Sequence, residues 1–333
     1  DVYKRQVRSR SVLGPIQLQS DDFMLDQVVV VGYGTQKKSD LTGSVAVVDA
    51  EALKQVSHSN ISSMLEGKVA GVQVTSDGQP GADPTVRIRG VGSFGDTSPL
   101  YVIDGVPMGT SIRDFSSNDI ETIQVLKDAS AAAIYGSRAA NGVVIITTKR
   151  GQKDQPLKVD YNGYFGVQEA TALPKTLNSY EYTTLYNEAC RNSGQQEKYL
   201  PEQIQKYKDG TDPMYPSIDY FDVYYDKASM QNHRLNVTGG SETFQYAIML
   251  GYLDQDGILV GTNYRKTDFR TNIDSYLLNK RLRVTTRLSG NYGVKNEPTE
   301  LWNAKWYATN APIFPLKNED GLWTVSYTHL RAH

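Results

Sequence analysis

A run of four valines followed by Gly-Tyr-Gly is the first stretch that could carry chemistry, within "DQVVVVGYGTQKK" at residues 26–38. A buried strand that ends in G-x-G opens a dinucleotide-binding fold, because the glycines let the backbone approach a pyrophosphate. The full fingerprint requires a third glycine where this chain has Lys37, and a helix whose N-terminus holds the phosphates. The chain instead resumes a strand-like alternation, with no room for a crossover helix before Asp49. The pattern therefore argues against a nucleotide site.

Side chains that could build a catalytic or metal centre are few. The chain has one cysteine, Cys190, and four histidines, of which His329 and His333 lie in the C-terminal segment. A disulfide framework, a cysteine-based zinc site and a Ser-His-Asp set all lack material, and no G-x-S-x-G motif is present. We therefore expect no enzyme, no metal and no cofactor.

Charge and hydropathy narrow the class of protein further. A net charge of −2 and a pI of about 6.1 give no basic field that would attract nucleic acid. No apolar run approaches the roughly 20 residues of a membrane-spanning helix, and the mean hydropathy is −0.46. Outer-membrane barrels remain open, because their strands alternate lipid-facing and lumen-facing residues. The 22 tyrosines fit a lipid–water boundary, where the ring is buried and the hydroxyl stays wet.

The first half of the chain mixes short strand and helix patterns, and residues 41–151 are expected to form one α+β domain. Strands alternate in "TVRIRG" and in "PLYVIDGVP", where Asp104-Gly105 is expected to be only a turn. Asp128 is placed to cap a small-residue helix over 129–135, which Gly136 would end.

The second half consists of long two-residue alternations with one apolar and one polar face. In "TFQYAIMLGYLD" the apolar set includes Phe244, Ile248 and Leu250. Arg234, Arg283 and Arg287 fall on polar faces, which would point into a wet lumen. Runs of about 9–13 residues match tilted transmembrane strands, whereas sandwich strands usually have five or six residues. The alternation thus favours a barrel over a β-sandwich but does not exclude the sandwich. A long insertion separates the first two strands and carries the expected helix "SYEYTTLYNEACRN".

Five stretches carry a resemblance to a known family: "LDQVVVVGYGTQKKSDLTGSV", "VRIRG", "PLYVIDGVP", "DIETIQVLKDASAAAIYGSRAANGVVIITTKRG" and "VDYNGYFGV". Together they closely resemble SusC/RagA-type TonB-dependent outer-membrane transporters, over residues 25 to about 295. In that family a globular plug sits inside a 22-stranded barrel. The resemblance implies an α+β plug domain followed by about five strands of an antiparallel transmembrane β-barrel, in a fragment truncated at both ends.

The resemblance also implies how the chain divides into segments. Residues 1–25 would hold a non-native end and the remnant of a carboxypeptidase-regulatory-like domain. Residues 26–40 would be the TonB box and linker, and 41–151 the plug. Residues 157–324 would begin the barrel, with the insertion at about 169–230, and 325–333 would be a second non-native end.

The TonB box is the extended segment that the energy-transducing protein TonB captures in this family. Extended, β-branched backbone with unpaired N–H and C=O groups can add to a partner's sheet, and Gly32 and Gly34 would end that strand. An ordinary buried strand of the plug is the alternative. The resemblance assigns the box to Asp26, Gln27, Val28, Val29, Val30, Val31, Gly32, Tyr33 and Gly34.

Substrate contacts are expected in two plug loops, because loops carry function on rigid scaffolds. The candidate residues are Ser93, Phe94, Asp96, Arg113, Asp114 and Phe115.

The implied function is energy-coupled import of large nutrients, such as oligosaccharides or peptides, across the outer membrane of a Gram-negative, Bacteroidota-like cell. The implied partners are TonB with its inner-membrane energising complex, a SusD-like surface lipoprotein and outer-membrane lipid, without nucleic acid or a cofactor. A secreted or surface β-sandwich that binds carbohydrate or mediates adhesion, without transport, is the alternative.

Overall fold

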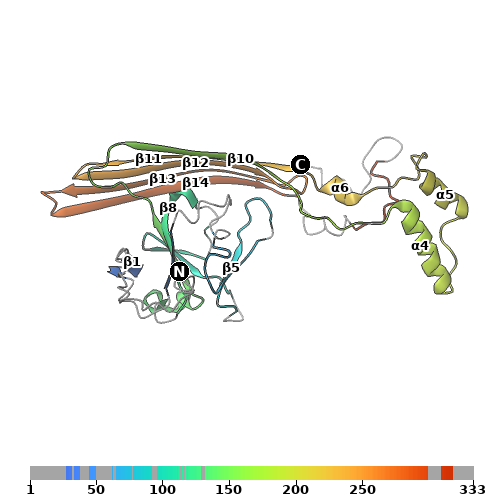
Figure 1. The fold of residues 1–333 in the computed structure, drawn as a ribbon, viewed down its shortest axis with the longest axis horizontal. Helices are drawn as coiled ribbons and strands as arrows, with labels where there is room; N and C mark the ends of the chain where they lie inside the picture. The colour runs from blue at the N-terminus through green and yellow to red at the C-terminus, as the bar shows by residue number, and fades with distance from the viewer. Residues whose placement is uncertain are drawn as a thin grey trace, which may run out of the picture.

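The computed structural model has a mixed N-terminal domain packed under a long antiparallel sheet, with a helical lobe beyond one end of that sheet (Figure 1). In the part of the chain that it describes, no helix is long and apolar enough to cross a bilayer. The described residues are 28–31, 34–37, 45–49, 62, 65–76, 78–91, 96–110, 112, 115, 117–128, 132–298 and 309–317.

The N-terminal domain is built on a five-stranded sheet with the order β3-β8-β9-β6-β7. β9 lies in the middle, antiparallel to β8 and parallel to β6. Its apolar run "VVII" is fully buried, as expected of a central strand covered on both faces. A separate hairpin, β4–β5, contributes Val74, Val86 and Ile88 to the same core. The bounds are β3 Val45–Asp49, β4 Val72–Thr75, β5 Thr85–Ile88, β6 Leu100–Ile103, β7 Val106–Gly109, the 3-10 helix η3 Ser117–Asp119, β8 Ile120–Leu126 and β9 Val143–Thr148.

Gly136 interrupts the helix between β8 and β9, as predicted. The 3-10 helix η4 (Ala133–Ala139) consists of two short segments on either side of Gly136, whose φ of 68° is a conformation that glycine adopts without steric cost. Residues 129–131 of the predicted helix over 129–135 lie outside the described residues. Asp128 forms an ion pair with Arg89 on the surface of the domain.

The long sheet consists of five antiparallel strands in sequential order, β10-β11-β12-β13-β14. Each pairs with its sequence neighbour over most of its length. All five lie in one open sheet, not in two sheets packed face to face, so the β-sandwich alternative is wrong. The bounds are β10 Lys158–Gln168, β11 Ala228–Gly240, β12 Phe244–Asp256, β13 Asn263–Leu277 and β14 Leu282–Asn296.

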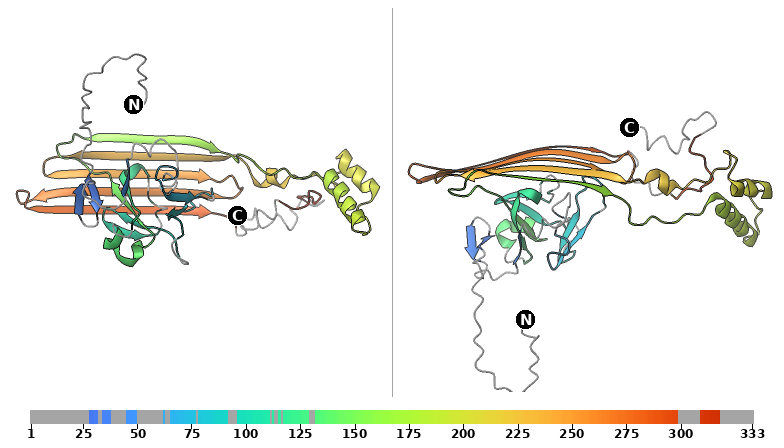
Figure 2. Two further views of the ribbon diagram at one scale, coloured as in Figure 1. Left: turned by 60° about the horizontal axis from the view of Figure 1, so that its bottom comes forward. Right: turned by 45° about the horizontal axis from the view of Figure 1, so that its top comes forward.

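The two faces of the long sheet meet different surroundings, as the alternation predicts. On β12, Phe244, Ile248 and Leu250 are exposed, whereas Ala247 and Met249 are fully buried. The N-terminal domain lies against the second of these faces (Figure 2). An apolar outward face and an inward face that meets a plug-like domain are the arrangement of a large outer-membrane barrel.

The connection between the two units is packed closely against the sheet at Gly151. A Cβ on Gly151 would lie 2.5 Å from backbone atoms of Gly239 and Tyr246, so only glycine fits there. The N–H of Gly240 also donates to the carbonyl of Gln155 at 2.9 Å. The expected joint at 151–156 is therefore fixed to the turn between β11 and β12.

The insertion after β10 forms the helical lobe seen beyond the end of the sheet (Figure 1). The predicted helix "SYEYTTLYNEACRN" is confirmed over its whole length as α4 (Ser179–Asn192), which begins at a capping box made by Asn178 and Glu181. Two shorter helices follow, α5 (Pro201–Asp209) and α6 (Tyr220–Tyr224).

Candidate functional site: the contact between the N-terminal domain and the long sheet

The contact is centred on a buried ion pair between Asp119 and Arg234. Asp119 ends η3, directly before β8, and Arg234 projects from the inward face of β11. Arg234 donates to Asp119 through both Nε, at 3.0 Å, and Nη2, and its Nη1 donates to Asp268 Oδ2 at 2.5 Å. The Arg234 side chain is only 2% exposed. Arg234 on β11 therefore joins Asp119 of the N-terminal domain to Asp268 on β13, the strand on the other side of β12.

Further charges surround this pair. Arg270 Nε lies 3.6 Å from Asp119 Oδ2, and its guanidinium stacks 4.1 Å above the ring of Phe115. Lys266 Nζ lies 3.9 Å from Asp268. Burial raises the pKa of Asp119 above its usual range, while the adjacent Arg234 guanidinium acts in the opposite direction. Charge-assisted hydrogen bonds of this kind fix one docking geometry, because each removed partner would leave a buried charge.

A second contact forms around Asp104. Asp104 and Gly105 both have positive φ and make the turn between β6 and β7, as expected. The Asp104 carboxylate also accepts from Thr148 Oγ1 at 2.5 Å and from Arg150 Nη2 at 3.3 Å. Its backbone carbonyl accepts from Arg287 Nη1 on β14 at 2.9 Å. The expectation that this dipeptide is only a turn is therefore wrong, since it also holds the sheet.

Asn272 on β13 extends this second contact. Its Nδ2 donates to Thr148 Oγ1 and to the carbonyl of Lys149, both at 2.9 Å. Thr148 thus accepts from the sheet and donates to Asp104 within the domain, which links the two units through one hydroxyl.

Arg234, Arg283 and Arg287 lie on the inward face of the sheet, as the alternation predicts, but they are not all exposed to solvent there. Arg283 pairs with Asp274 at 3.0 Å on the same face of the sheet, and Arg287 reaches the N-terminal domain. Arg234 is the exception to the expected solvation, because the N-terminal domain covers it completely.

The described residues of the predicted TonB box, Val28–Val31 and Gly34, lie in a small hairpin. Val28–Val31 form β1, as the expected extended strand, and pair with β2 (Gly34–Lys37) in a two-stranded sheet of their own. The valine run is therefore not a strand of the five-stranded sheet. One of its edges is paired, contrary to expectation, and Gly34 begins β2 instead of ending the valine strand. Asp26, Gln27, Gly32 and Tyr33 lie outside the described residues.

Two of the predicted substrate residues, Asp96 and Phe115, lie in the part of the chain that the structure describes. Phe115 is buried beneath Arg270. The Asp96 carboxylate accepts from the N–H of Ser98 at 2.9 Å, which holds its pKa below the usual range. Ser93, Phe94, Arg113 and Asp114 lie outside the described residues.

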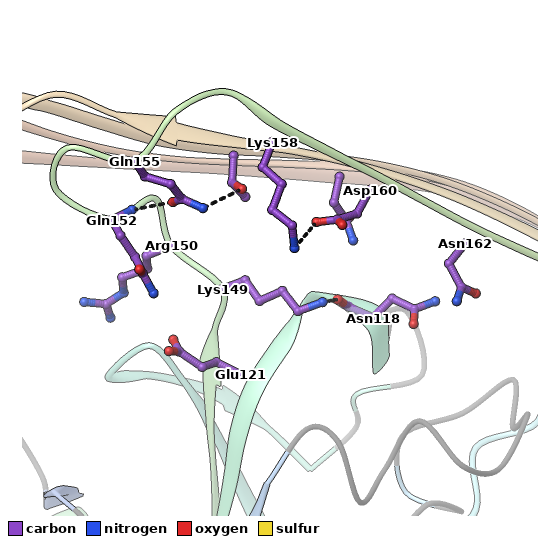
Figure 3. A pocket seen from close by; sticks show the side chains of 11 residues that line it. Asn118, Glu121, Lys149, Arg150, Gln152, Gln155, Lys158, Asp160 and Asn162 are labelled. Carbon is purple, nitrogen blue, oxygen red and sulfur yellow. Dashed lines mark hydrogen bonds and ion pairs between the residues drawn. The ribbon is translucent and has the colours of Figure 1, made fainter.

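A polar cleft adjoins these contacts, between the N-terminal domain and strands β10 and β11 (Figure 3). Its volume is about 390 Å³, and all eleven side chains that line it are polar or charged. Among the described residues, no group of three or more histidine, cysteine, aspartate and glutamate side chains lies close enough together to hold a metal ion.

Comparison with known proteins places this architecture in a class. Residues 37–143 match the family model of the TonB-dependent receptor plug domain. The chain is 39% identical to TonB-dependent receptor P26 of Formosa agariphila, over 92% of this chain and 30% of the relative. The chain therefore belongs to the TonB-dependent receptors, with a plug domain followed by antiparallel strands of the barrel wall.

Within that class, the relatives are of the SusC/RagA type. The chain is 38% identical to TonB-dependent receptor SusC of Bacteroides thetaiotaomicron, over 77% of this chain and 25% of the relative. The solved structure of the RagAB peptide importer in its open-open state matches with a TM-score of 0.70 and 29% identity, over 81% of this chain and 33% of that one. The chain spans about a third or less of the length of these relatives.

Proposed function

We propose that the protein to which this chain belongs imports large nutrients across the outer membrane of a Gram-negative bacterium, using energy delivered by TonB. The N-terminal domain, proposed to span residues 41–151, is the plug, and β10–β14 begin the barrel wall around it. Val28–Val31 lie in the proposed TonB box, Asp26 to Gly34. The free edge of β1 is available for strand addition by TonB, since β1 pairs only with β2 in the part of the chain described.

The observation that carries this proposal is the polar character of the contact between plug and wall. Asp119, Arg234, Asn272 and Thr148 join the two units through ionic and hydrogen-bonding groups. Water can satisfy such groups once they separate, whereas an apolar interface would lose its favourable burial. The outward face of the same sheet is apolar, which suits lipid. A plug that must be released from a wall embedded in a membrane requires both a polar contact with that wall and an apolar outer face on it.

The proposed substrates are oligosaccharides or peptides, and the proposed partner is a SusD-like surface lipoprotein. Support comes from the relatives, one of which is SusC, while the matched structure is that of a peptide importer. The family consists of receptors and transporters, and we propose no enzymatic activity.

A reversible tether tests whether the plug must move. Thr148→Cys with Asn272→Cys would join plug to wall, because these side chains are in contact in the structure. Ala247→Cys with Asn272→Cys is the matched control, since Ala247 lies directly opposite Asn272 on the neighbouring wall strand. Both pairs would be placed in the full-length receptor, whose TonB-dependent uptake of labelled oligosaccharides and peptides is then measured.

The tethered receptor should lose uptake and regain it on reduction, while the wall-only disulfide should leave uptake unchanged. Equal uptake by the fully oxidised plug tether and the reduced receptor would contradict the proposed function.

A further inference from the structure

The hairpin β4–β5 ends in a tight turn that contacts the wall near the lobe end of the long sheet (Figure 1). The N–H of Ala82 donates to the carbonyl of Gln79 at 3.2 Å, which closes a β-turn. Pro80 and Gly81 occupy its two central positions, and Gly81 has φ 61°, as the second central position of a type II turn requires. Pro80 is buried although it lies in a loop. The tip of the hairpin is therefore a defined element that another part of the chain covers.

The turn and the wall each supply one ring and one glycine to this contact. A Cβ on Gly81 would lie 2.5 Å from Cγ of Tyr264 on β13, whose side chain is largely buried. A Cβ on Gly257, in the turn between β12 and β13, would lie 2.8 Å from Cγ of Pro80. Each ring therefore rests on a residue that has no side chain to displace it. We call these four residues, Pro80, Gly81, Gly257 and Tyr264, the interlock.

The contact between plug and wall changes in character along β13. This strand begins next to the lobe, where Leu259 in the preceding turn pairs with Tyr225 after α6. Tyr264, in the interlock, belongs to an apolar cluster of the wall. Four residues further along, Asp268 belongs to the buried ion pairs, and after four more Asn272 donates to the plug. At about 3.3 Å per residue, each step covers about 13 Å. An apolar contact near the lobe is thus followed by charged and polar contacts farther from it.

The proposed force would reach the plug at the opposite end. The β1–β2 hairpin lies away from the lobe, whereas β5 lies toward it (Figure 1). A body held along a line and pulled at one end separates from that end first. The polar contacts exchange their partners for water as they part, whereas opening the interlock would expose apolar surface.

We infer that the plug pivots about the interlock during import, so that its far end leaves the wall while Pro80 and Gly81 stay docked. This inference rests on the proposed function and adds to it the axis of the plug's motion. The linker of residues 152–157 limits the swing, because six residues span at most about 20 Å when fully extended. A pivot moves the plug as a body, so its own core around Val144 stays closed.

Single cysteines in the full-length receptor, with its other cysteines replaced, test the axis. Pro80→Cys lies in the interlock, Thr148→Cys in the polar contact and Val144→Cys in the plug core on the same strand, and all three positions are buried at rest. A small maleimide is applied during import to cells with and without TonB. TonB should speed the labelling of Thr148→Cys at least tenfold and change that of Pro80→Cys and Val144→Cys less than twofold. Equal acceleration at Pro80→Cys would overturn the pivot, and equal acceleration at Val144→Cys would show that the plug unfolds instead.

A tether at the interlock gives an independent test. Gly81→Cys with Tyr264→Cys would join plug to wall there, and because the positive φ at Gly81 strains a cysteine, import is compared between the oxidised and reduced states of the same variant. The oxidised form should keep at least half of the import of the reduced form, in contrast to the Thr148→Cys with Asn272→Cys tether. Loss of import on oxidation would overturn the pivot. A parent receptor without TonB-dependent uptake would instead overturn the proposed function.

Discussion

Replacing Arg234 by methionine should loosen the plug more than any change to an exposed ion pair. The substitution keeps much of the apolar stem but removes the three hydrogen bonds to Asp119 and Asp268. Removing one partner of a buried ion pair costs about 3–5 kcal/mol, because it leaves a buried charge without compensation. Arg270, 3.6 Å from the other oxygen of Asp119, offers partial compensation. We therefore expect about 3 kcal/mol, a change of roughly a hundredfold in the equilibrium between docked and released plug.

The measurement is urea-induced release of the plug from the full-length receptor in detergent, read by brief protease pulses. Arg265→Met is the matched control, because Arg265 pairs with Asp254 but is largely exposed, and it should leave the midpoint unchanged. The double variant Asp119→Leu with Arg234→Met should recover part of the loss, since it no longer leaves Asp119 buried and unpaired. A midpoint for Arg234→Met that equals the Arg265→Met midpoint would refute the argument that this pair holds the plug.

Three further predictions concern the TonB box and the plug. Val30→Pro should abolish pull-down of the periplasmic domain of TonB. In the β1–β2 register the Val30 N–H points away from β2, toward the edge that TonB would pair with, and proline has no N–H to donate. Undiminished capture would exclude strand addition at this edge. Burial raises the pKa of Tyr101 to about 12 from an ordinary value near 10, so its contribution to stability is complete below about pH 10 and is lost as the pH rises through 12. The loss should approach ~3 kcal/mol in urea titrations of the plug and be absent in Tyr101→Phe, and identical pH profiles would contradict it. Residues 41–151 expressed alone should unfold cooperatively on heating, because their strands share one buried core; a gradual transition would mean that the plug needs the wall.

The features that sequence alone predicts here are those set by local periodicity. The alternation in β12 assigns Phe244 and Ile248 to one face and Met249 to the other, and the structure confirms both. The helix α4 is recognisable because Asn178 and Glu181 mark its start three residues apart. Each of these signals depends on neighbours within a few positions, so no knowledge of the tertiary arrangement is needed.

The candidate site depends on partners that are far apart in the chain, and periodicity does not identify them. Asp119 and Arg234 are separated by 115 positions. The alternation shows that Arg234 points inward, but not that a carboxylate from the plug meets it there. A usable signal was nonetheless present on β13, where Lys266, Asp268 and Arg270 share the inward face with both signs of charge. Buried charges of both signs require partners, which points to an ionic contact with whatever fills the barrel.

The choice of ionic groups for this contact is itself informative about release. A buried ion pair is seldom the most stable solution, because apolar side chains of similar volume often stabilise a protein as well or better. The plug has an apolar core of its own around Ile123 and Val144, so its sequence does not lack the means to build an apolar surface. Yet Asp119, Asp104 and Thr148 are the groups through which it makes its hydrogen bonds and ion pairs to the wall. When such groups part, water can hydrate them. In the proposed import cycle, a plug held by these contacts docks in one geometry at rest and separates under force while its own core stays intact.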